Sequence, residues 1–358
     1  MERNETDNQE NPAASGRVTA GSLLVGAVLA ILVIVAAIAV FRIDTWGENG
    51  SKLSDRFTYD IDEITNVDPS LVRYKETARF SVGMDDVRAI AVGLDDQMYV
   101  AGDRAVRVFD SKGDELRAID IGKEPSCLAV GNSDHNTPGR LYVGAGDRVM
   151  MYDSVGESAG VWDQGFDEKT ILTSIAVADE DVFVADAGNR VVLRYNVEGE
   201  LVGRIGDPDP KRNLRGFVIP SPYFDVAITG SDVVCIANPG ARRIEAYTFD
   251  GAWLGEWGKA SADIDGFFGC CNPANFAVLA DGRFVTVEKG LPRIKVYSRG
   301  GDFECVVAEP RVLAPGEIVV DEIRDDHQVK VFDVATDSSG RILVLDPTNH
   351  TVRVFEPT

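Results

Sequence analysis

The chain has 358 residues, of which 44% are apolar and 26% charged, a composition typical of a globular protein. Fifty-eight acidic residues against 36 basic ones give a net charge of −22. A surface of that sign repels phosphate backbones and anionic headgroups, which argues against nucleic acid as a partner. Five cysteines are too few to staple a chain of this length with disulfides.

The first predicted element is an apolar run that follows a polar tail. Residues 1–17 are rich in Asn, Glu and Pro and are expected to be disordered. Residues 18–41, from Val18 to Phe41, hold no charge and lie between two arginines. At about 1.5 Å per helical residue, this run reaches roughly 36 Å, enough for a hydrocarbon core of about 30 Å. The sequence therefore predicts one transmembrane helix.

A cleaved signal peptide is the competing interpretation of this run, because Ala37-Ile38-Ala39 resembles a cleavage site. The apolar core is longer than the usual stretch of about 7–15 residues, which favours an uncleaved anchor. Positive charges on the two sides do not decide the orientation. A short tail before a first span most often stays cytoplasmic, so we expect a single-pass protein with its C-terminal part on the extracytoplasmic side. Residues 42–73 would form the tether.

Six diverged repeats are predicted after the tether, over residues 74–358. Each opens with a small-apolar triplet, continues through a second apolar run and a tight turn, and ends on a third run that closes with an aromatic residue. The alanines that align the triplets are Ala91, Ala129, Ala176, Ala227, Ala277 and Ala335. The closing aromatics are Phe109, Tyr152, Tyr195, Tyr247, Tyr297 and Phe355. A glycine stands four residues after each of the first five aromatics, which indicates one structural unit repeated in a fixed register.

The apolar runs have the pattern of strands. They are short, rich in β-branched and aromatic residues, and bounded by Gly, Asp, Asn or Pro. A further run often follows the glycine, as in ELVGRIG at residues 200–206, so each unit predicts four strands. Four strands in about 40–50 residues are typical of a β-propeller blade. The predicted fold class is all-β, a six-bladed propeller preceded by one transmembrane helix.

The third unit, VADAGNRVVLRYNVEGELVGRIG, resembles an NHL repeat, in which Asp and Asn occupy the turn between the second and third strands. VLDPTNHTVRVFE in the sixth unit resembles it nearly as closely, whereas units one, two and four carry other turns. The resemblance implies a six-bladed propeller of NHL type and leaves the activity open. Some NHL propellers bind RNA through a basic face. Here 54 acidic and 34 basic residues follow the apolar run, so we expect no nucleic-acid partner.

The way in which the ring closes can also be predicted. The sixth unit ends three residues after Phe355 and so holds no fourth strand of its own. The segment from Thr77 to Val82 precedes the first unit and is otherwise unassigned. We expect it to complete the last blade as its outer strand, which joins the two ends of the domain and removes an exposed edge.

The loop that enters the fifth unit, FFGCCNPANFAVLADG, departs from the repeat pattern because it contains two adjacent cysteines. In a propeller, this loop and the turn between the second and third strands lie on one face, where binding sites usually sit. That turn and the loops of the sixth unit add further polar side chains to the same face. The candidate ligand-binding residues are Cys270, Cys271, Asn272, Asn275, Glu288, Lys289, Arg293, His327 and His350.

Three interpretations of the adjacent cysteines stay open. Cys270 and Cys271 could form a vicinal disulfide, one of them could bridge to Cys305, or their thiolates could bind a soft metal. In an oxidising compartment a disulfide is the default, which favours a bridge over a metal. Cys127 and Cys235 lie in predicted strands and are expected to be small buried apolar residues.

Nothing in the sequence supports catalysis directly. Some NHL-type propellers are lyases that hold a metal with histidines from several blades. Here His135 falls in a hairpin on the opposite face, which leaves only His327 and His350, so a three-histidine zinc site is not available. HExxH and phosphate-loop patterns are absent from the sequence. No residue is assigned a catalytic role and no cofactor is required.

We therefore expect a membrane-tethered binding or scaffolding module, which meets another protein or a small ligand at the loop face of the propeller. A metal- or thiol-dependent enzyme that works in the channel is the second hypothesis. A redox or electron-transfer accessory that uses the cysteine pair is the third.

Overall fold

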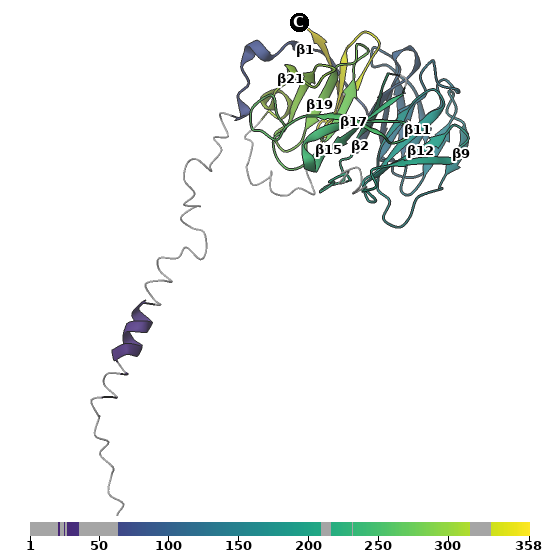
Figure 1. The fold of residues 1–358 in the computed structure, drawn as a ribbon. Helices are drawn as coiled ribbons and strands as arrows, with labels where there is room; N and C mark the ends of the chain where they lie inside the picture. Colours follow the sequence, from purple (N-terminus) through teal and green to yellow (C-terminus); the bar gives the residue numbers. More distant parts are fainter. Residues whose placement is uncertain are drawn as a thin grey trace, which may run out of the picture. The chain divides into compact units, whose positions relative to one another are not determined.

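The computed structural model describes residues 64–208, 216–230, 232–315 and 331–358, together with helical residues Gly21, Val25 and 27–35 (Figure 1). The chain divides into two units, residues 1–59 and 60–358, and each is considered by itself. Within these described ranges, no helix is long and apolar enough to cross a membrane. The predicted tail 1–17, most of the predicted span and the tether up to residue 63 lie outside the described residues.

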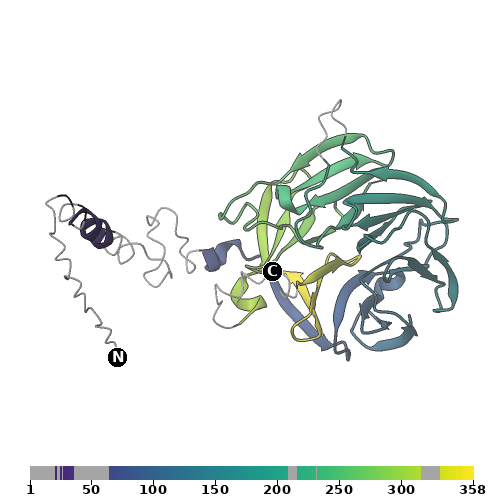
Figure 2. The ribbon, with the colours of Figure 1, turned by 90° about the horizontal axis from the view of Figure 1, so that it is seen from below.

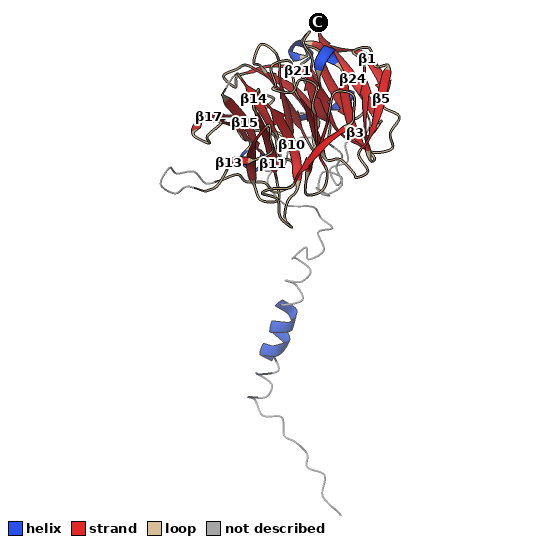
Figure 3. Cartoon of the chain, turned by 90° about the vertical axis from the view of Figure 1, so that its right-hand side faces the viewer, coloured by secondary structure: helices blue, strands red, loops and turns tan. Residues whose placement is uncertain are grey.

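The second unit is a six-bladed β-propeller. Its described residues form six four-stranded antiparallel sheets, and strands dominate it in Figure 3. The first three blades are β2(Val87–Val92), β3(Met98–Gly102), β4(Ala105–Phe109) and β5(Glu115–Asp120); β6(Cys127–Val130), β7(Leu141–Gly144), β8(Val149–Tyr152) and β9(Ser158–Trp162); and β10(Leu172–Val177), β11(Asp181–Asp186), β12(Val191–Asn196) and β13(Leu201–Ile205). The fourth and fifth are β14(Val226–Thr229), β15(Val233–Asn238), β16(Arg243–Thr248) and β17(Trp253–Trp257); and β18(Asn275–Val278), β19(Phe284–Glu288), β20(Arg293–Tyr297) and β21(Phe303–Ala308). The sixth is β22(Asp333–Thr336), β23(Ile342–Asp346), β24(Thr351–Pro357) and β1(Tyr74–Ser81).

In each blade we call the strands a to d, from the inside outwards. The inner a strands are neighbours in a closed circle, with β22 next to both β18 and β2, and Figure 2 shows the resulting ring. Short helical segments occupy the connections: η2(Pro69–Leu71), η3(Leu94–Asp96), η4(Pro239–Ala241) and α3(Pro310–Leu313). The d–a loops and b–c turns therefore emerge at one end of the ring, the loop face, and the a–b hairpins at the other.

The described residues form six apolar core clusters, each shared by two adjacent blades. Every closing aromatic of the sequence repeat lies in a different cluster, from Phe109 between the sixth and first blades to Tyr297 between the fourth and fifth. Because a single four-stranded sheet cannot bury both of its faces, each blade depends on its neighbours for its core. The repeat observed in the sequence is thus the repeat of the interblade contact.

The glycine four residues after each of the first five closing aromatics has a positive φ and lies next to the outer strand of the preceding blade. Gly199 lies in a c–d turn with φ of 89°, and Gly301 occupies the same turn two blades later with φ of 87°. A Cβ at Gly301 would approach Trp257 of the preceding blade to 2.4 Å. Any other residue at Gly301 would meet both a disfavoured φ and a clash with the neighbouring outer strand.

The ring closes as the sequence predicts. β1 pairs with β24 in antiparallel register, from Tyr74 opposite Pro357 to Ser81 opposite Thr351, and becomes the outer strand of the sixth blade. Arg353 of β24 is 1% exposed, and its Nη2 lies 2.6 Å from Oε2 of Glu76 in β1. The same nitrogen donates to the carbonyl of Val312 at 3.1 Å. The predicted strand, Thr77 to Val82, overlaps β1 but begins three residues too late.

Glu76→Gln should lower the free energy of unfolding, because it leaves the guanidinium of Arg353 buried with a weaker partner. We expect a loss of about 2 kcal/mol, below the usual cost of breaking a buried pair because the bond to Val312 remains. Urea unfolding of the intact chain measures the change. The matched control is Lys75→Gln on the same strand, whose exposed side chain should tolerate the change within about 0.5 kcal/mol. Equal midpoints for the two variants would contradict the role given to the pair.

Candidate functional site

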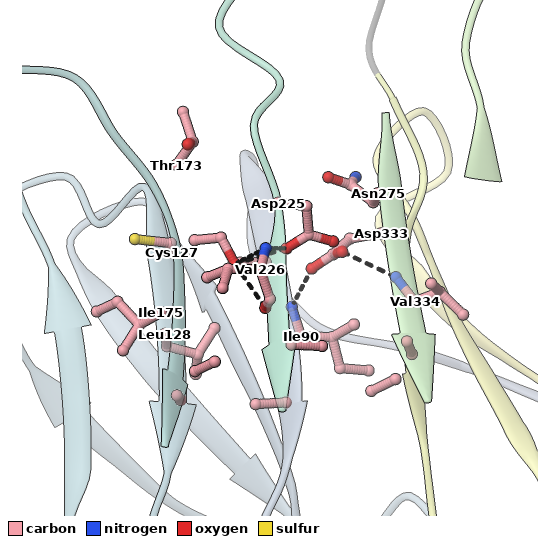
Figure 4. Close-up of a pocket in the computed structure, with 18 of the residues that line it drawn as sticks. Ile90, Cys127, Leu128, Thr173, Ile175, Asp225, Val226, Asn275, Asp333 and Val334 are labelled. Carbon is pink, nitrogen blue, oxygen red and sulfur yellow. Dashed lines mark hydrogen bonds between the residues drawn. The ribbon is translucent and has the colours of Figure 1, made fainter. Parts of the chain in front are cut away.

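The inner strands place one ring of side chains at the loop-face end of the central channel. The ring position lies two residues before each repeat alanine, within three residues of the point where the a strand begins. Its members are Ala89, Cys127, Ser174, Asp225, Asn275 and Asp333, and Figure 4 labels Cys127, Asp225, Asn275 and Asp333 around the channel. The cavity that they line has a volume of about 1050 Å³ and touches the inner strands of all six blades. Four polar members follow one another from the third blade to the sixth.

Each polar member of the ring bonds to the next blade. Ser174 donates to Oδ1 of Asp225 at 2.5 Å, and Oδ2 of Asp225 accepts from the backbone N–H of Phe276 at 2.6 Å. Asn275 donates to the carbonyl of Phe332 at 2.8 Å. Asp333 accepts from the backbone N–H of Ile90 at 2.8 Å (Figure 4). Side chains at this level of the channel thus join neighbouring blades by hydrogen bonds.

The two carboxyls of the ring hold protons more tightly than ordinary aspartates do. Burial raises the pKa of Asp225 to about 6, against the opposing effect of the hydrogen bond from Ser174. Burial also raises the pKa of Asp333, to about 7, and the charge of Asp225 raises it further. Because one carboxylate makes the ionisation of the other harder, the pair is expected to titrate as a coupled unit near neutral pH.

The charged residues elsewhere in the lining are also mostly acidic. Asp86 lies at the loop-face end, and Asp134 and Asp179 lie at the a–b end. The arginine of the lining, Arg88, is paired with Asp86 at 2.7 Å and with Glu124 at 3.3 Å. The channel therefore offers acceptors and negative charge to whatever enters it.

The raised pKa values of Asp225 and Asp333 predict a stability that falls as the pH rises. In an unfolded chain an aspartate titrates near pH 3.9, so between about pH 4 and pH 7 the folded state binds more protons than the unfolded state. The contribution is complete below pH 4 and is lost by about pH 7, with a slope of up to about 1.4 kcal/mol per pH unit for each group. Asp333→Asn should flatten this slope, measured as urea midpoints across the window.

The exposed Asp302 provides the control for this pH dependence, since Asp302→Asn changes the same charge away from the channel. It should leave the slope as in the wild type. A slope that Asp333→Asn does not alter would contradict the assignment of the titration to the ring.

The sequence-predicted cysteine loop lies on the loop face between β17 and β18. Cys270 is exposed and Cys271 is fully buried, and their Sγ atoms lie 3.3 Å apart as free thiols. Asn272 is 1% exposed and fixes the loop to the b–c turn of the same blade. Its Oδ1 accepts from the backbone N–H of Lys289 at 2.8 Å, and its Nδ2 donates to the Lys289 carbonyl at 3.1 Å. The expected proximity of this loop and turn is therefore present.

Two other predicted ligand-binding residues form a buried ion pair beneath the same loop. Glu288 and Arg293 are 0% and 1% exposed, and Nε of Arg293 lies 2.6 Å from Oε2 of Glu288. Lys295 joins them at 3.1 Å, and Glu288 also accepts from the backbone N–H of Phe268 at 2.8 Å. Their polar groups are thus used to anchor the loop, and they do not face the channel.

The remaining predicted residues are dispersed. His350 lies in the b–c turn of the sixth blade with φ of 53°, and His327 lies outside the described residues. Cys305, on β21, belongs to the cluster between the fifth and sixth blades, and no contact joins it to the cysteine pair in the described part. In that part no group of three or more His, Cys, Asp or Glu side chains could hold a metal ion.

His135 has a structural role. It lies in an a–b hairpin, as the sequence predicts, and is 2% exposed. Its Nδ1 lies 2.7 Å from the carbonyl of Ala178 in the next blade, and its Nε2 lies 2.9 Å from the hydroxyl of Tyr142. The imidazole therefore joins the second and third blades at the end opposite the loop face.

Of the polar ring residues, only Asn275 is among the ligand-binding residues predicted from the sequence, and Ser174, Asp225 and Asp333 are not. The signal was present, because the position two residues before the repeat alanine is polar in four of six units. The spacing GxSxG also occurs in the sequence, at Gly156–Gly160. There Ser158 begins the exposed outer strand β9, so it does not occupy the strand-to-helix turn of a hydrolase nucleophile.

Comparison with known proteins supports the fold. No family model and no curated protein sequence matches the chain. A streptogramin B lyase structure matches with a TM-score of 0.55 and 9% identity, over 80% of this chain and 98% of that chain. Virginiamycin B lyase from Staphylococcus aureus matches with a TM-score of 0.52 and 9% identity, over 80% and 100%. The WD40 propeller domain of Doa1 matches with a TM-score of 0.51 and 14% identity, over 80% and 97%.

At these identities the likeness shows the propeller fold alone. That fold suits a protein-binding scaffold role, since it presents rigidly held loops around one channel. It does not transfer an activity, because unrelated functions share it.

Proposed function

We propose that the protein is a binding module of NHL type, whose ligand or protein partner enters the channel from the loop face with a hydrogen-bond donor, such as an ammonium group. The observation that carries this proposal is the pair Asp225 and Asp333, held in one acceptor-rich ring at the end of a cavity of about 1050 Å³. The ring contains carboxyl and amide oxygens, and a donor-bearing group matches them chemically.

The geometry of Asp333 favours such a ligand. Its Oδ1 accepts from the backbone N–H of Val334 at 2.9 Å and its Oδ2 accepts from that of Ile90. Each carboxylate oxygen can accept about two hydrogen bonds, so each has capacity for one more. A cation bound there would favour the charged carboxylate and lower the pKa that burial has raised. Binding near pH 6.5 is therefore expected to release protons.

Butylammonium and a short lysine-containing peptide are suitable probes of this site. We expect both to bind the intact protein and to release up to about one proton per ligand, because the pKa values of the two carboxyls lie near 6 and 7. Calorimetric titration at about pH 6.5, in two buffers of different ionisation enthalpy, measures affinity and proton release together. Asp333→Asn should weaken binding by about tenfold or more, the loss of one charge-assisted hydrogen bond.

The matched control is Asp134→Asn, which removes the same charge from the exposed a–b end of the same cavity. It should bind the probes as the wild type does. Equal weakening in both variants would mean that only the overall charge of the channel matters. Binding without proton release, or no binding, would contradict a site at Asp225 and Asp333.

The second part of the proposal is that residues 18–41 tether the propeller to a membrane as a single-pass anchor, with the propeller on the extracytoplasmic side. The 24-residue uncharged run and the short polar tail before it support this. The lyase neighbours do not extend it to lyase chemistry, since the likeness is one of fold.

Protease added to intact cells tests this placement. We expect it to digest the propeller while an N-terminal tag stays protected, because the only long apolar run of the sequence precedes the propeller. Digestion only after lysis would reverse the orientation. A mature N-terminus near Val40 would replace the anchor by a cleaved signal peptide.

A further inference from the structure

The adjacent thiols of Cys270 and Cys271 are a side-chain pair that the binding proposal does not use. Their Sγ atoms lie 3.3 Å apart, in contact with one another but not bonded. The other three cysteines, Cys127, Cys235 and Cys305, are each buried within a different core cluster. The pair is thus isolated from any competing thiol in the described part of the chain.

The two thiols differ in access. Cys270 is exposed, whereas Cys271 is fully buried. Burial raises the pKa of the Cys271 thiol, against the opposing effects of Ser221 and of the Lys289 ammonium. A reagent in solution therefore meets Cys270 first, and Cys271 is placed to react only with a sulfur already held at Cys270.

The backbone on both sides of the pair is fixed. On the N-terminal side, the N–H of Phe268 is bound by the buried Glu288. On the C-terminal side, Asn272 bonds to both backbone groups of Lys289. The ammonium of Lys289 lies 3.2 Å from the hydroxyl of Ser221 and 4.9 Å from the ring centroid of Tyr223, in the loop entering the fourth blade. The thiols are thus held together by an anchored loop and do not meet by chance on a free one.

We propose that Cys270 and Cys271 are a reversible dithiol–disulfide site that reacts with low-molecular-weight disulfides of the glutathione type. The site goes beyond ligand binding in the channel and does not depend on it. Cys270 is the attacking thiol and Cys271 the resolving thiol.

The exchange takes place in two balanced steps. The Cys270 thiol loses its proton, and its thiolate attacks one sulfur of the small disulfide, which forms a mixed disulfide and releases one small thiolate. The Cys271 thiol then loses its proton, and its sulfur attacks Sγ of Cys270, which releases the second small thiolate. The two protons pass to the two released thiolates. The protein dithiol is oxidised by two electrons and one small disulfide is reduced to two thiols.

To test this site, the intact protein is equilibrated with reduced and oxidised glutathione, and its tryptic peptides are then analysed by mass spectrometry. Trypsin releases residues 260–283 as one peptide, which holds Cys270, Cys271 and no other cysteine. As the oxidised fraction rises, we expect this peptide to lose two hydrogens in a single transition and to lose both sites of alkylation. Brief alkylation of the reduced protein should label Cys270 at least about tenfold faster than Cys271, in line with its exposure.

Single substitutions separate the two roles. Cys271→Ser should stop at the first step and accumulate glutathione on Cys270, and Cys270→Ser should show neither adduct nor bridge. Cys305→Ser is the control and should leave the transition unchanged. The proposal fails if the wild type stops at the mixed disulfide, if both thiols stay free in excess oxidised glutathione, or if either cysteine bridges to Cys305. None of these outcomes bears on the binding of amines to the channel.

Discussion

Antiparallel pairing of β1 with β24 is the constraint on which the propeller depends. Five blades are each built from a continuous stretch of chain, but the sixth is complete only when the first strand of the domain returns to the last. Until this pairing forms, the sixth blade presents an open edge, and the cluster that includes Phe109 and Val354 lacks the cover of Phe80. The buried pair of Arg353 with Glu76 adds a specific electrostatic contact to the same seam. Closure therefore links the stability of the first and last blades to that of the whole ring.

Closure also positions the channel. Because the inner strands form a closed circle, equivalent positions on successive strands lie at one level, and a single polar substitution in the repeat becomes part of a ring. Asp225 and Asp333 show the consequence, since each uses an oxygen to bond to the next blade and still faces the cavity. The same side chains join the blades and form the proposed binding site. Protonation of these carboxyls therefore affects both ligand binding in the channel and the stability of the ring.

The sequence could predict the fold because its repeats reflect packing between blades. The closing aromatics and the glycines four residues later were visible in the sequence, and each proves to contact a neighbouring blade. The candidate site was harder to predict from the sequence. The sequence predicts Glu288 and Arg293 as ligand-binding residues from their place on the loop face, yet the strand pattern does not show that these opposite charges form a buried ion pair. Whether a side chain in a turn points to the channel or to the interior depends on tertiary packing, which a strand pattern does not encode.

Asp225 and Asp333 are the converse case, because they line the channel but were not predicted as binding residues. Asp225 lies just before β14 and Asp333 is the first residue of β22, so in the sequence each is easily taken for part of the preceding loop. Only the closed ring brings these residues of the fourth and sixth blades into electrostatic contact. The cysteine pair was visible from composition alone. Which of its members is exposed depends on Asn272 and on the buried ion pair below, and these contacts could not be derived from the sequence.

The closing seam also has a mechanical consequence. The backbone carbonyl of Arg73 accepts from the N–H of Thr358 at 3.0 Å, and the N–H of Arg73 donates to the carbonyl of Val306 at 3.1 Å. The chain that precedes Tyr74 therefore enters the propeller next to its C-terminus, on the strand that closes the ring. A pulling force applied through that chain would load its contacts with β21 of the fifth blade, at Val72 and Arg73, as well as the β1–β24 ladder of the sixth. Tension on the entering chain would thus be shared between the last two blades and would not fall on the closing strand alone.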